Sequence, residues 1–339
     1  MSTAESEKTP AALEKKAQSL KNDFQALKAE LSRAMVGQDE VLRAVLVSLF
    51  AGGHVLLEGV PGLGKTHLVR CLSDVCSLTF SRIQFTPDLM PADVLGTNVL
   101  VEEPGVGRHL QFQAGPIFTH LLLADEINRA TPKTQSALLE AMQEKQVTAG
   151  GVLYRIEEPF LVLGTQNPLE MEGTFPLPEA QLDRFFFRVP IHFPGPEDLH
   201  KILELTTSFE IPQLKVVCDG DSLMAHRKLL QQIPVTRDIR TQAIQLVLAT
   251  HPERPEAIDL VQRFVRYGAS PRGAQALIQA AKIHALIDDR FHVSRADLLW
   301  AAPYALHHRI LLNFEALAEG ITPDAIIQDL TKRHVSANK

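Results

Sequence analysis

The order of apolar and polar positions along the chain predicts buried strands that alternate with helices. Short apolar runs are typical of strands buried on both faces, and they occur at His54–Glu58, Thr79–Phe85, Leu121–Asp125, Phe160–Thr165 and Arg184–Ile191. Helical periodicity follows the first run over Lys65–Ser77. Because parallel strands joined by helices form a sheet covered on both faces, the pattern predicts a three-layer α/β/α core with a parallel sheet.

Two helices are expected before the first strand. Good helix formers and apolar residues at helical spacing predict a helix over residues 11–31, and Gln38–Phe50 predicts a second one. The polar start, Met1–Pro10, favours disorder.

Two stretches do not fit a minimal core, and we expect both to be insertions that project from it. Residues 86–118 contain a hairpin-like segment, Val99–Gln113, which turns around Gly105-Val106-Gly107. Residues 145–159 predict a second hairpin that turns at Gly150-Gly151.

The segment His192–Pro196 breaks the pattern and is expected to be a hinge. Beyond it the chain favours helices, apart from strand-like alternation at Gln213–Val217, so we expect a second, helical part of the chain. The helices are expected at Leu223–Gln232, Asp238–Thr250, Pro255–Tyr267, Arg272–Ile287, Arg295–Tyr304 and Pro323–Lys332.

Composition narrows the functional classes. The chain has 339 residues, of which 45% are hydrophobic and 22% are charged. Its formal net charge is −6, and it therefore lacks the excess of basic residues that would favour a nucleic-acid partner. The three cysteines do not have the spacing of metal ligands and cannot form a disulfide framework, which favours a reducing compartment. No apolar run approaches the roughly 18 residues of a membrane span, and no signal-peptide core is present. We therefore expect a cytoplasmic protein without a membrane span.

A phosphate-binding loop is the strongest chemical signal in the chain. Residues Gly59, Val60, Pro61, Gly62, Leu63, Gly64, Lys65 and Thr66 form the pattern G-x-x-x-x-G-K-[ST] between a strand and a helix. Backbone N–H groups at the glycines can surround a β-phosphate, with the helix N-terminus pointing at the anion. Lys65 can reach the phosphates and Thr66 can ligate Mg²⁺, so we expect ATP and Mg²⁺ to bind here, with His67 completing the binding segment.

Polar residues also end two further strands. Asp125, expected to hold Mg²⁺, and Glu126, expected to polarise the attacking water, end the run Leu121–Asp125. Asn167 follows Phe160–Thr165 and can bond the γ-phosphate and the water. The alternatives are a solvated strand end for the acids and an ordinary Asn-Pro turn for Asn167.

Hydrolysis also needs positive charge where the γ-phosphate charge spreads in the transition state. Arg184, Arg188 and Arg272 are candidates, although any single arginine is more often a surface charge.

The chain resembles the AAA+ ATPases, and among them the MoxR family. The resemblance covers about residues 30–310, and its motifs are Val36-Gly37-Gln38, Asp125–Ala130, Pro132–Met142, Thr165–Pro168 and Glu172–Phe185. It implies that Val36 and Gly37 lie on the adenine side of the nucleotide. It also implies that Asn167 is sensor 1, Arg272 is sensor 2 and Arg184 is the arginine finger that reaches the neighbouring subunit's ATP; the choice between Arg184 and Arg188 stays open.

The resemblance also implies an architecture and partners. A helical or disordered extension (residues 1–30) would precede an AAA+ core (31–193) and a helical lid (197–339). The segment 86–118 would be the helix-2 insert, and 145–159 the pre-sensor-1 hairpin. Subunits would assemble into a homo-oligomer, a hexameric ring, that remodels a protein client beside a protein with a von Willebrand factor A domain.

Three functions are compatible with these residues. The first is an ATPase whose assembled subunits drive chaperone-like remodeling of a client, with γ-phosphate loss changing the lid angle through Arg272. The second is a nucleotide-gated, non-enzymatic scaffold, which has no need of Glu126. The third is a nucleic-acid motor, which the acidic balance disfavours.

Overall fold

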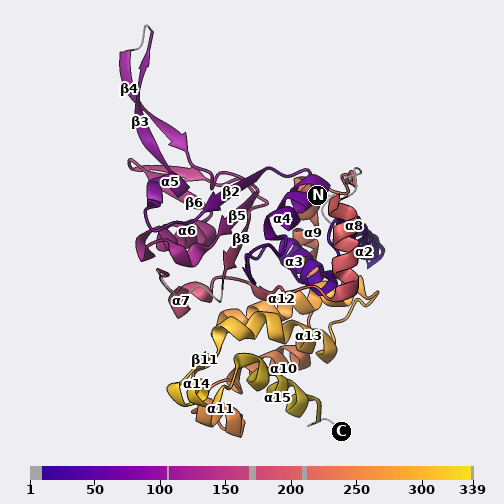
Figure 1. The fold of residues 1–339 in the computed structure, drawn as a ribbon. Coiled ribbons are helices and arrows are strands. Elements are labelled where there is room, and N and C mark those ends of the chain that lie inside the picture. Colours follow the sequence, from indigo (N-terminus) through magenta and orange to yellow (C-terminus); the bar gives the residue numbers. More distant parts are fainter. Residues whose placement is uncertain (1–9, 105–106, 168–172, 208–211, 337–339) are drawn as a thin grey trace, which may run out of the picture.

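A parallel five-stranded sheet forms the centre of the computed structural model, which describes residues 10–104, 107–167, 173–207 and 212–336. The strands lie in the order β2-β5-β8-β1-β9, of which β2, β5 and β8 are labelled in Figure 1. In that order they are Phe80–Gln84, Leu121–Asp125, Leu161–Gln166, Val55–Glu58 and Phe187–Pro190. All five fall on the predicted apolar runs, and the α/β prediction is confirmed.

Alternate residues of the central strands enter two separate apolar cores, one on each face of the sheet. Leu57 and Leu123 belong to the first core, whereas Leu56 and Leu122 belong to the second. The first face is covered by α2 (Pro10–Ser32), α3 (Asp39–Ala51) and α4 (Lys65–Val75). The second is covered by α5 (Pro91–Leu95) and α6 (Pro132–Glu144). The result is the expected three-layer arrangement.

Helix α2 is integrated into the first core. Its apolar side chains Leu20, Phe24, Leu27 and Leu31 are buried, and the helix contacts α3, α4, α9 (Gly220–Gln232) and α12 (Pro271–Ile287). The first nine residues, which we expected to be disordered, lie outside the described residues.

Truncating Leu27 to alanine should lower the free energy of unfolding by about 2–5 kcal/mol, because the cavity would open among fully buried side chains. Urea unfolding followed by circular dichroism measures this loss. Gln25→Ala, on the exposed side of the same helix, is the control and should change the value by less than about 0.5 kcal/mol. Equal effects of the two substitutions would contradict the packing of α2 as part of the core.

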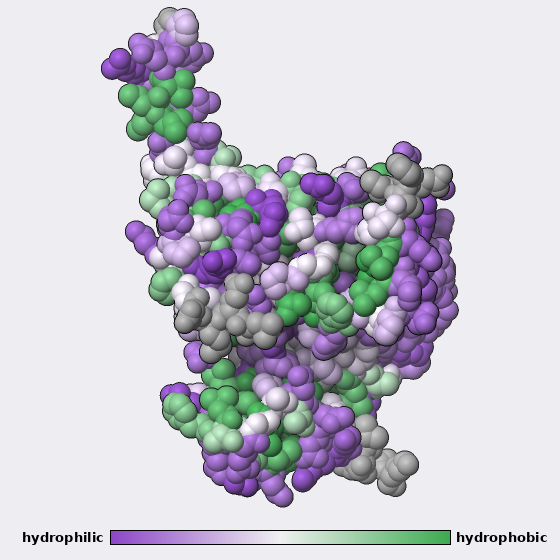
Figure 2. All heavy atoms as spheres, in the orientation of Figure 1, coloured by the Kyte–Doolittle hydropathy of each residue, from purple (hydrophilic) through white to green (hydrophobic). Residues whose placement is uncertain are grey.

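Each of the two predicted insertions contains a hairpin. Strands β3 (Gly96–Glu103) and β4 (Gly107–Ala114) project far beyond the body (Figure 1), and their turn at 105–106 lies outside the described residues. Figure 2 shows apolar residues along this hairpin, where Leu100 and Leu110 pair across the strands and are exposed. The second hairpin joins β6 (Gln146–Ala149) to β7 (Val152–Arg155). The rings of Phe112 and Tyr154 stack between the hairpins with centroids 3.9 Å apart.

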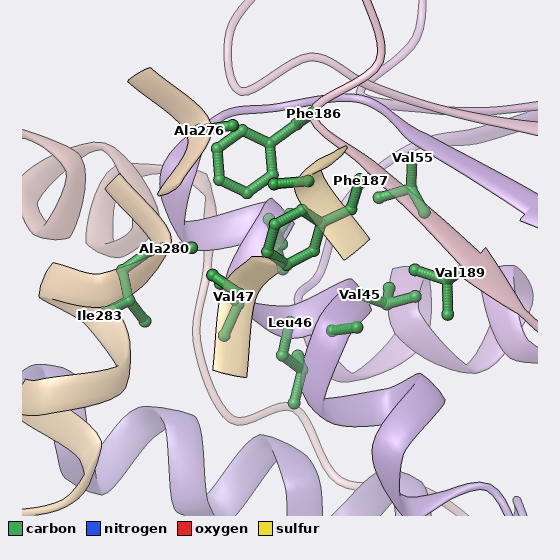
Figure 3. Packing of buried hydrophobic residues seen from close by; sticks show 14 of the residues in the cluster. Val45, Leu46, Val47, Val55, Phe186, Phe187, Val189, Ala276, Ala280 and Ile283 are labelled. Atoms are coloured by element: carbon green, nitrogen blue, oxygen red, sulfur yellow. The ribbon is translucent and has the colours of Figure 1, made fainter. Parts of the chain in front are cut away.

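The C-terminal part is mainly helical, as predicted. Helix α12 joins it to the core, with Phe186 and Phe187 packed between α3 and α12 (Figure 3). Among the described helices, none has the length and apolar character that crossing a bilayer requires. The remaining helices are α8 (Pro196–Thr207), α10 (Arg237–Leu248), α11 (Asp259–Phe264), α13 (Arg295–Leu306), the 3₁₀ turn η2 (His307–Arg309), α14 (Phe314–Glu319) and α15 (Pro323–Ser336).

The lid differs from the prediction in its strands. The helix expected over Pro255–Tyr267 ends at Phe264, and β10 (Val265–Tyr267) then pairs antiparallel with β11 (Leu311–Leu312). Val265 is buried, whereas Arg266 and Tyr267 are both exposed, so the segment lacks the strict alternation that is typical of a strand. The strand expected at Gln213–Val217 is absent from the described residues. This segment is instead a loop in which Val217 N–H donates to Val75 of α4 and Lys215 N–H donates to Glu30 of α2. The core–lid boundary stays a prediction, since α9 packs on α2 and α3 as well as on α12.

Candidate functional site

The phosphate loop connects β1 to α4, and its glycines are required by the backbone. Gly62 and Gly64 have φ angles of 84° and 77°, in the left-handed region that side chains disfavour. A Cβ on Gly59 would lie 2.8 Å from the carbonyl oxygen of Ile191. The loop can therefore present its N–H groups inward at the start of α4, where an anion is favoured.

Lys65 lies among carboxylates at the first turn of α4. Its Nζ contacts the carbonyl oxygen of Gly59 in the same loop. Burial lowers the pKa of Lys65, while the charges of Asp125, Glu126 and Glu58 act in the opposite direction. A half-buried cation between a loop of N–H groups and several carboxylates fits a phosphate and a divalent cation together.

The two predicted acidic residues sit at the carboxyl end of β5. Thr165 of β8 donates to Asp125 Oδ1 at 2.6 Å and accepts the backbone N–H of Glu126 at 2.8 Å. Glu126 has a φ of 55°, a left-handed conformation that is costly outside glycine. The hydroxyl of the fully buried Thr165 therefore fixes this turn and the direction in which both carboxylates leave the strand.

Three polar residues that the sequence analysis missed hold these acids. Gln84 donates to Glu126 Oε2 at 2.7 Å, and Arg129 donates to the same oxygen at 3.0 Å. Arg82 pairs with Asp125 at 2.7 Å. Gln84 is the last residue of β2 and Arg129 ends the 3₁₀ turn η1 (Ile127–Arg129). Their position beside the end of β5 was the available signal, but it required the strand order β2-β5 to be known.

Asn167 and the adenine-side motif complete the same edge of the sheet. Asn167 is buried and follows β8, which lies between β5 and β1. Gln38 donates to the carbonyl oxygen of Leu63 at 3.1 Å, so the adjacent Val36 and Gly37 lie beside the phosphate loop. His67 is exposed in the first turn of α4. The motif Val36-Gly37-Gln38 therefore contacts the phosphate loop, and Asn167 directly follows Gln166, whose carbonyl oxygen accepts the N–H of Gly59.

Arg184 and Arg272 lie together at the opposite edge of the sheet. The backbone N–H of Phe186 donates a hydrogen bond to the carbonyl oxygen of His54. This bond places the segment after Arg184 at the amino end of β1. Both arginines line a cavity of about 240 Å³, where Arg272 lies 3.3 Å from Gln143 Oε1. A four-residue strand spans about 13 Å, so both guanidinium groups are separated from the phosphate loop of their own chain.

Arg188 has a different environment. It lies within β9 beside β1, and its guanidinium contacts the carboxylate of Glu58 and the ring of His307. Glu58 directly precedes the phosphate loop. Arg188 is therefore held inside its own subunit, whereas Arg184 faces a cavity.

Two family models match the chain. The model described as "ATPase family associated with various cellular activities (AAA)" matches residues 54–187, and "AAA lid domain" matches residues 258–330. The first includes the phosphate loop, both carboxylates and Arg184, and the second includes helices α11 to α14 and most of α15.

Similar proteins cover nearly the whole chain. Chaperone MoxR1 of Mycobacterium tuberculosis is 41% identical over 299 residues, which are 88% of this chain and 78% of that protein. Protein MoxR of Methylorubrum extorquens is 31% identical and covers 88% of this chain and 90% of its own. A solved structure of a proposed ATPase from Cytophaga hutchinsonii has a TM-score of 0.87 and 38% identity, and covers 94% of this chain and 96% of its own. The chain therefore belongs to the MoxR family of AAA+ ATPases.

Proposed function

We propose that this protein hydrolyses ATP only when assembled and uses the reaction to remodel or mature a protein client. The observation that carries the proposal is the placement of Arg184 and Arg272 at the edge of the sheet opposite to their own phosphate loop. One chain thus has a phosphate site at one edge and arginines at the other. Two chains placed head to tail would bring these halves together.

Each residue has a role in this proposal. Residues Gly59–Thr66 and His67 would hold the phosphates of ATP, with Val36 and Gly37 beside the adenine. The Thr66 hydroxyl and the Asp125 carboxylate would hold Mg²⁺, which would neutralise phosphate charge. Glu126 would accept a proton from the attacking water, and Asn167 would orient that water.

The arginines would act on the neighbour's ATP. Arg184 would stabilise the charge that spreads over the γ-phosphate, which is the role of an arginine finger. Arg272 lies beside it, so any contact of Arg272 with nucleotide would also be with the neighbour's, not with the nucleotide of its own chain. A change of lid angle at His192–Pro196 would follow from the contacts that the γ-phosphate makes and then loses.

The assembly and the partners belong to the same proposal. We infer a homo-oligomer, a hexameric ring, acting in the cytoplasm on a protein client, together with a protein that carries a von Willebrand factor A domain. The three free, buried thiols support a reducing compartment. The intact Glu126 supports an enzyme over a non-enzymatic scaffold, and the negative net charge disfavours a nucleic-acid partner.

Turnover per chain should rise steeply with protein concentration, while ATP binding per chain should stay constant, because binding uses one subunit and hydrolysis uses two. Phosphate release measured across a dilution series, with the oligomeric state followed by mass photometry, checks this. Monomers that turn over ATP as fast per chain as assembled protein would contradict the proposal. Nucleotide-dependent partner binding without turnover at any concentration would favour the scaffold instead.

A further inference from the structure

The 3₁₀ turn η2 (His307–Arg309) is the part of the lid that holds the segment carrying Arg184. Arg309 is almost fully buried, and its guanidinium donates to the backbone carbonyls of Asp183 (3.0 Å), Phe185 (2.7 Å) and Phe186 (3.3 Å). It also pairs with the Asp183 carboxylate at 2.8 Å. One side chain therefore fixes the backbone on both sides of Arg184.

Other lid residues strengthen this attachment. Ser270 donates to Asp183 Oδ1 at 2.7 Å, and His308 contacts the carbonyl oxygen of Phe185 at 3.0 Å. Burial and the charge of Arg309 lower the pKa of His308, so this ring is neutral at physiological pH and donates through Nε2 to that carbonyl. The segment 183–186 is thus bonded to the lid through side chains with little freedom to move.

The first residue of the same turn is linked through Arg188 to the start of the subunit's own phosphate loop. His307 contacts Arg188, and Arg188 pairs with Glu58, the residue before the phosphate loop. Gly59 follows Glu58 in the chain, and its carbonyl oxygen accepts a hydrogen bond from Nζ of Lys65, the residue expected to bind phosphate. His307 also lies 3.2 Å from Asp324 of α15, within the lid. A series of contacts, with one step along the chain from Gly59 to Glu58, therefore connects Lys65 to η2 and, through Arg309, to the backbone beside Arg184.

We propose that η2 couples the nucleotide site of each subunit to the arginine finger that the same subunit presents to its neighbour. This inference depends on the proposed role of Arg184. When Lys65 leaves the Gly59 carbonyl to pair with phosphate, the chain at Glu58–Gly59 is released from this contact, and the Glu58–Arg188–His307 contacts adjust. Since Arg309 and His307 are two residues apart in a tight turn, a shift of η2 moves the backbone beside Arg184. His307 and Arg309 are positioning residues, not catalytic ones.

The contacts of Arg309 with residues 183–186 are tested by Arg309→Lys, which keeps the charge but loses the forked hydrogen bonds. We expect turnover to fall about 10²-fold, because the finger is misplaced, with ATP binding unchanged. Mixing this variant with Lys65→Ala should restore turnover, since the second variant supplies an intact finger to an intact phosphate site. Mixing it with Arg184→Ala should restore nothing, because neither variant supplies a working finger.

Arg290→Lys is the matched control. Arg290 forms a forked pair with the buried Asp297 in the lid, at 2.6 and 2.7 Å, in contacts that do not include residues 183–186. The Arg290→Lys substitution should lower the free energy of unfolding without lowering ATP turnover of the assembled protein. Should Arg309→Lys fail to fold, Asp183→Asn, which removes the charge but keeps the size, should give the same mixing pattern.

The contact of His307 with Arg188 is tested by measuring how ATP turnover depends on ATP concentration. The wild type should show a Hill coefficient above unity, and His307→Ala should lower it to unity while the maximal rate changes less than about twofold. A coefficient that is unchanged in His307→Ala, or already unity in the wild type, would overturn the coupling.

The mixing results also separate this inference from the proposed function. Rescue of Arg184→Ala, but not of Arg309→Lys, by Lys65→Ala overturns the role of η2 and leaves the shared site intact. Failure to rescue Arg184→Ala in demonstrated mixed assemblies overturns the shared site itself, and the coupling with it.

Discussion

Glu126→Gln should lower ATP turnover by about 10²–10⁴-fold and leave ATP binding and assembly intact. Glutamine has nearly the same size and can still accept the hydrogen bond from Gln84, which is 2.7 Å in the present structure. It cannot take the proton of the attacking water. The backbone at residue 126 has a φ of 55°, and its N–H donates to the Thr165 hydroxyl. This constrained turn should keep the substituted side chain in place.

Phosphate release under saturating ATP, together with calorimetric titration of ATP, measures the two quantities separately. Glu14→Gln on the exposed side of α2 is a matched control, and it should leave both unchanged. Unchanged turnover in Glu126→Gln would remove this carboxylate from the chemistry. Lost ATP binding would instead show that the substitution disturbs the phosphate site.

Arg184→Ala should lower turnover by about 10³-fold or more, the effect expected for an arginine finger, and the loss should be repaired in mixed assemblies. Lys65→Ala lacks a working phosphate site but keeps the finger. A mixed oligomer places intact phosphate loops beside intact fingers, so part of the activity should return. The measurement is phosphate release as a function of the mixing ratio, with co-assembly confirmed by native mass spectrometry.

Arg188→Ala is the internal control for this experiment. Arg188 contacts Glu58 within its own subunit, so a neighbour cannot supply what it loses. Lys65→Ala should therefore rescue Arg184→Ala and should not rescue Arg188→Ala. The opposite pattern would assign the finger to Arg188.

The sequence was sufficient for the phosphate loop and the central strands, because both are local patterns. Gly59–Thr66 has fixed spacing, and runs such as Leu121–Asp125 are apolar over their whole length. Their placement at one edge followed from the rule that ligands bind at the carboxyl ends of parallel strands.

The rest depended on contacts between distant segments. The position of Arg184 follows from the path of residues 173–183 along α6, where Gln181 bonds Ser136, and no local pattern encodes that path. Arg272 reaches the same cavity from α12, a distant part of the chain. The contact of Gln84 with Glu126 joins residues 42 positions apart. The short strands β10 and β11 arise from pairing across 44 residues, between Tyr267 and Leu311, so the periodicity of either segment alone could not reveal them.

The separation of phosphate loop and arginines to opposite edges of the sheet gives every assembly a polarity. In an open chain of n subunits, the subunit at one end has a nucleotide that no arginine reaches, and the subunit at the other end has arginines with nothing to act on. Such an arc contains n − 1 complete reaction centres, and closing it creates the last one. Closure or breakage at a single seam would therefore switch one centre on or off without any change in the nucleotide concentration.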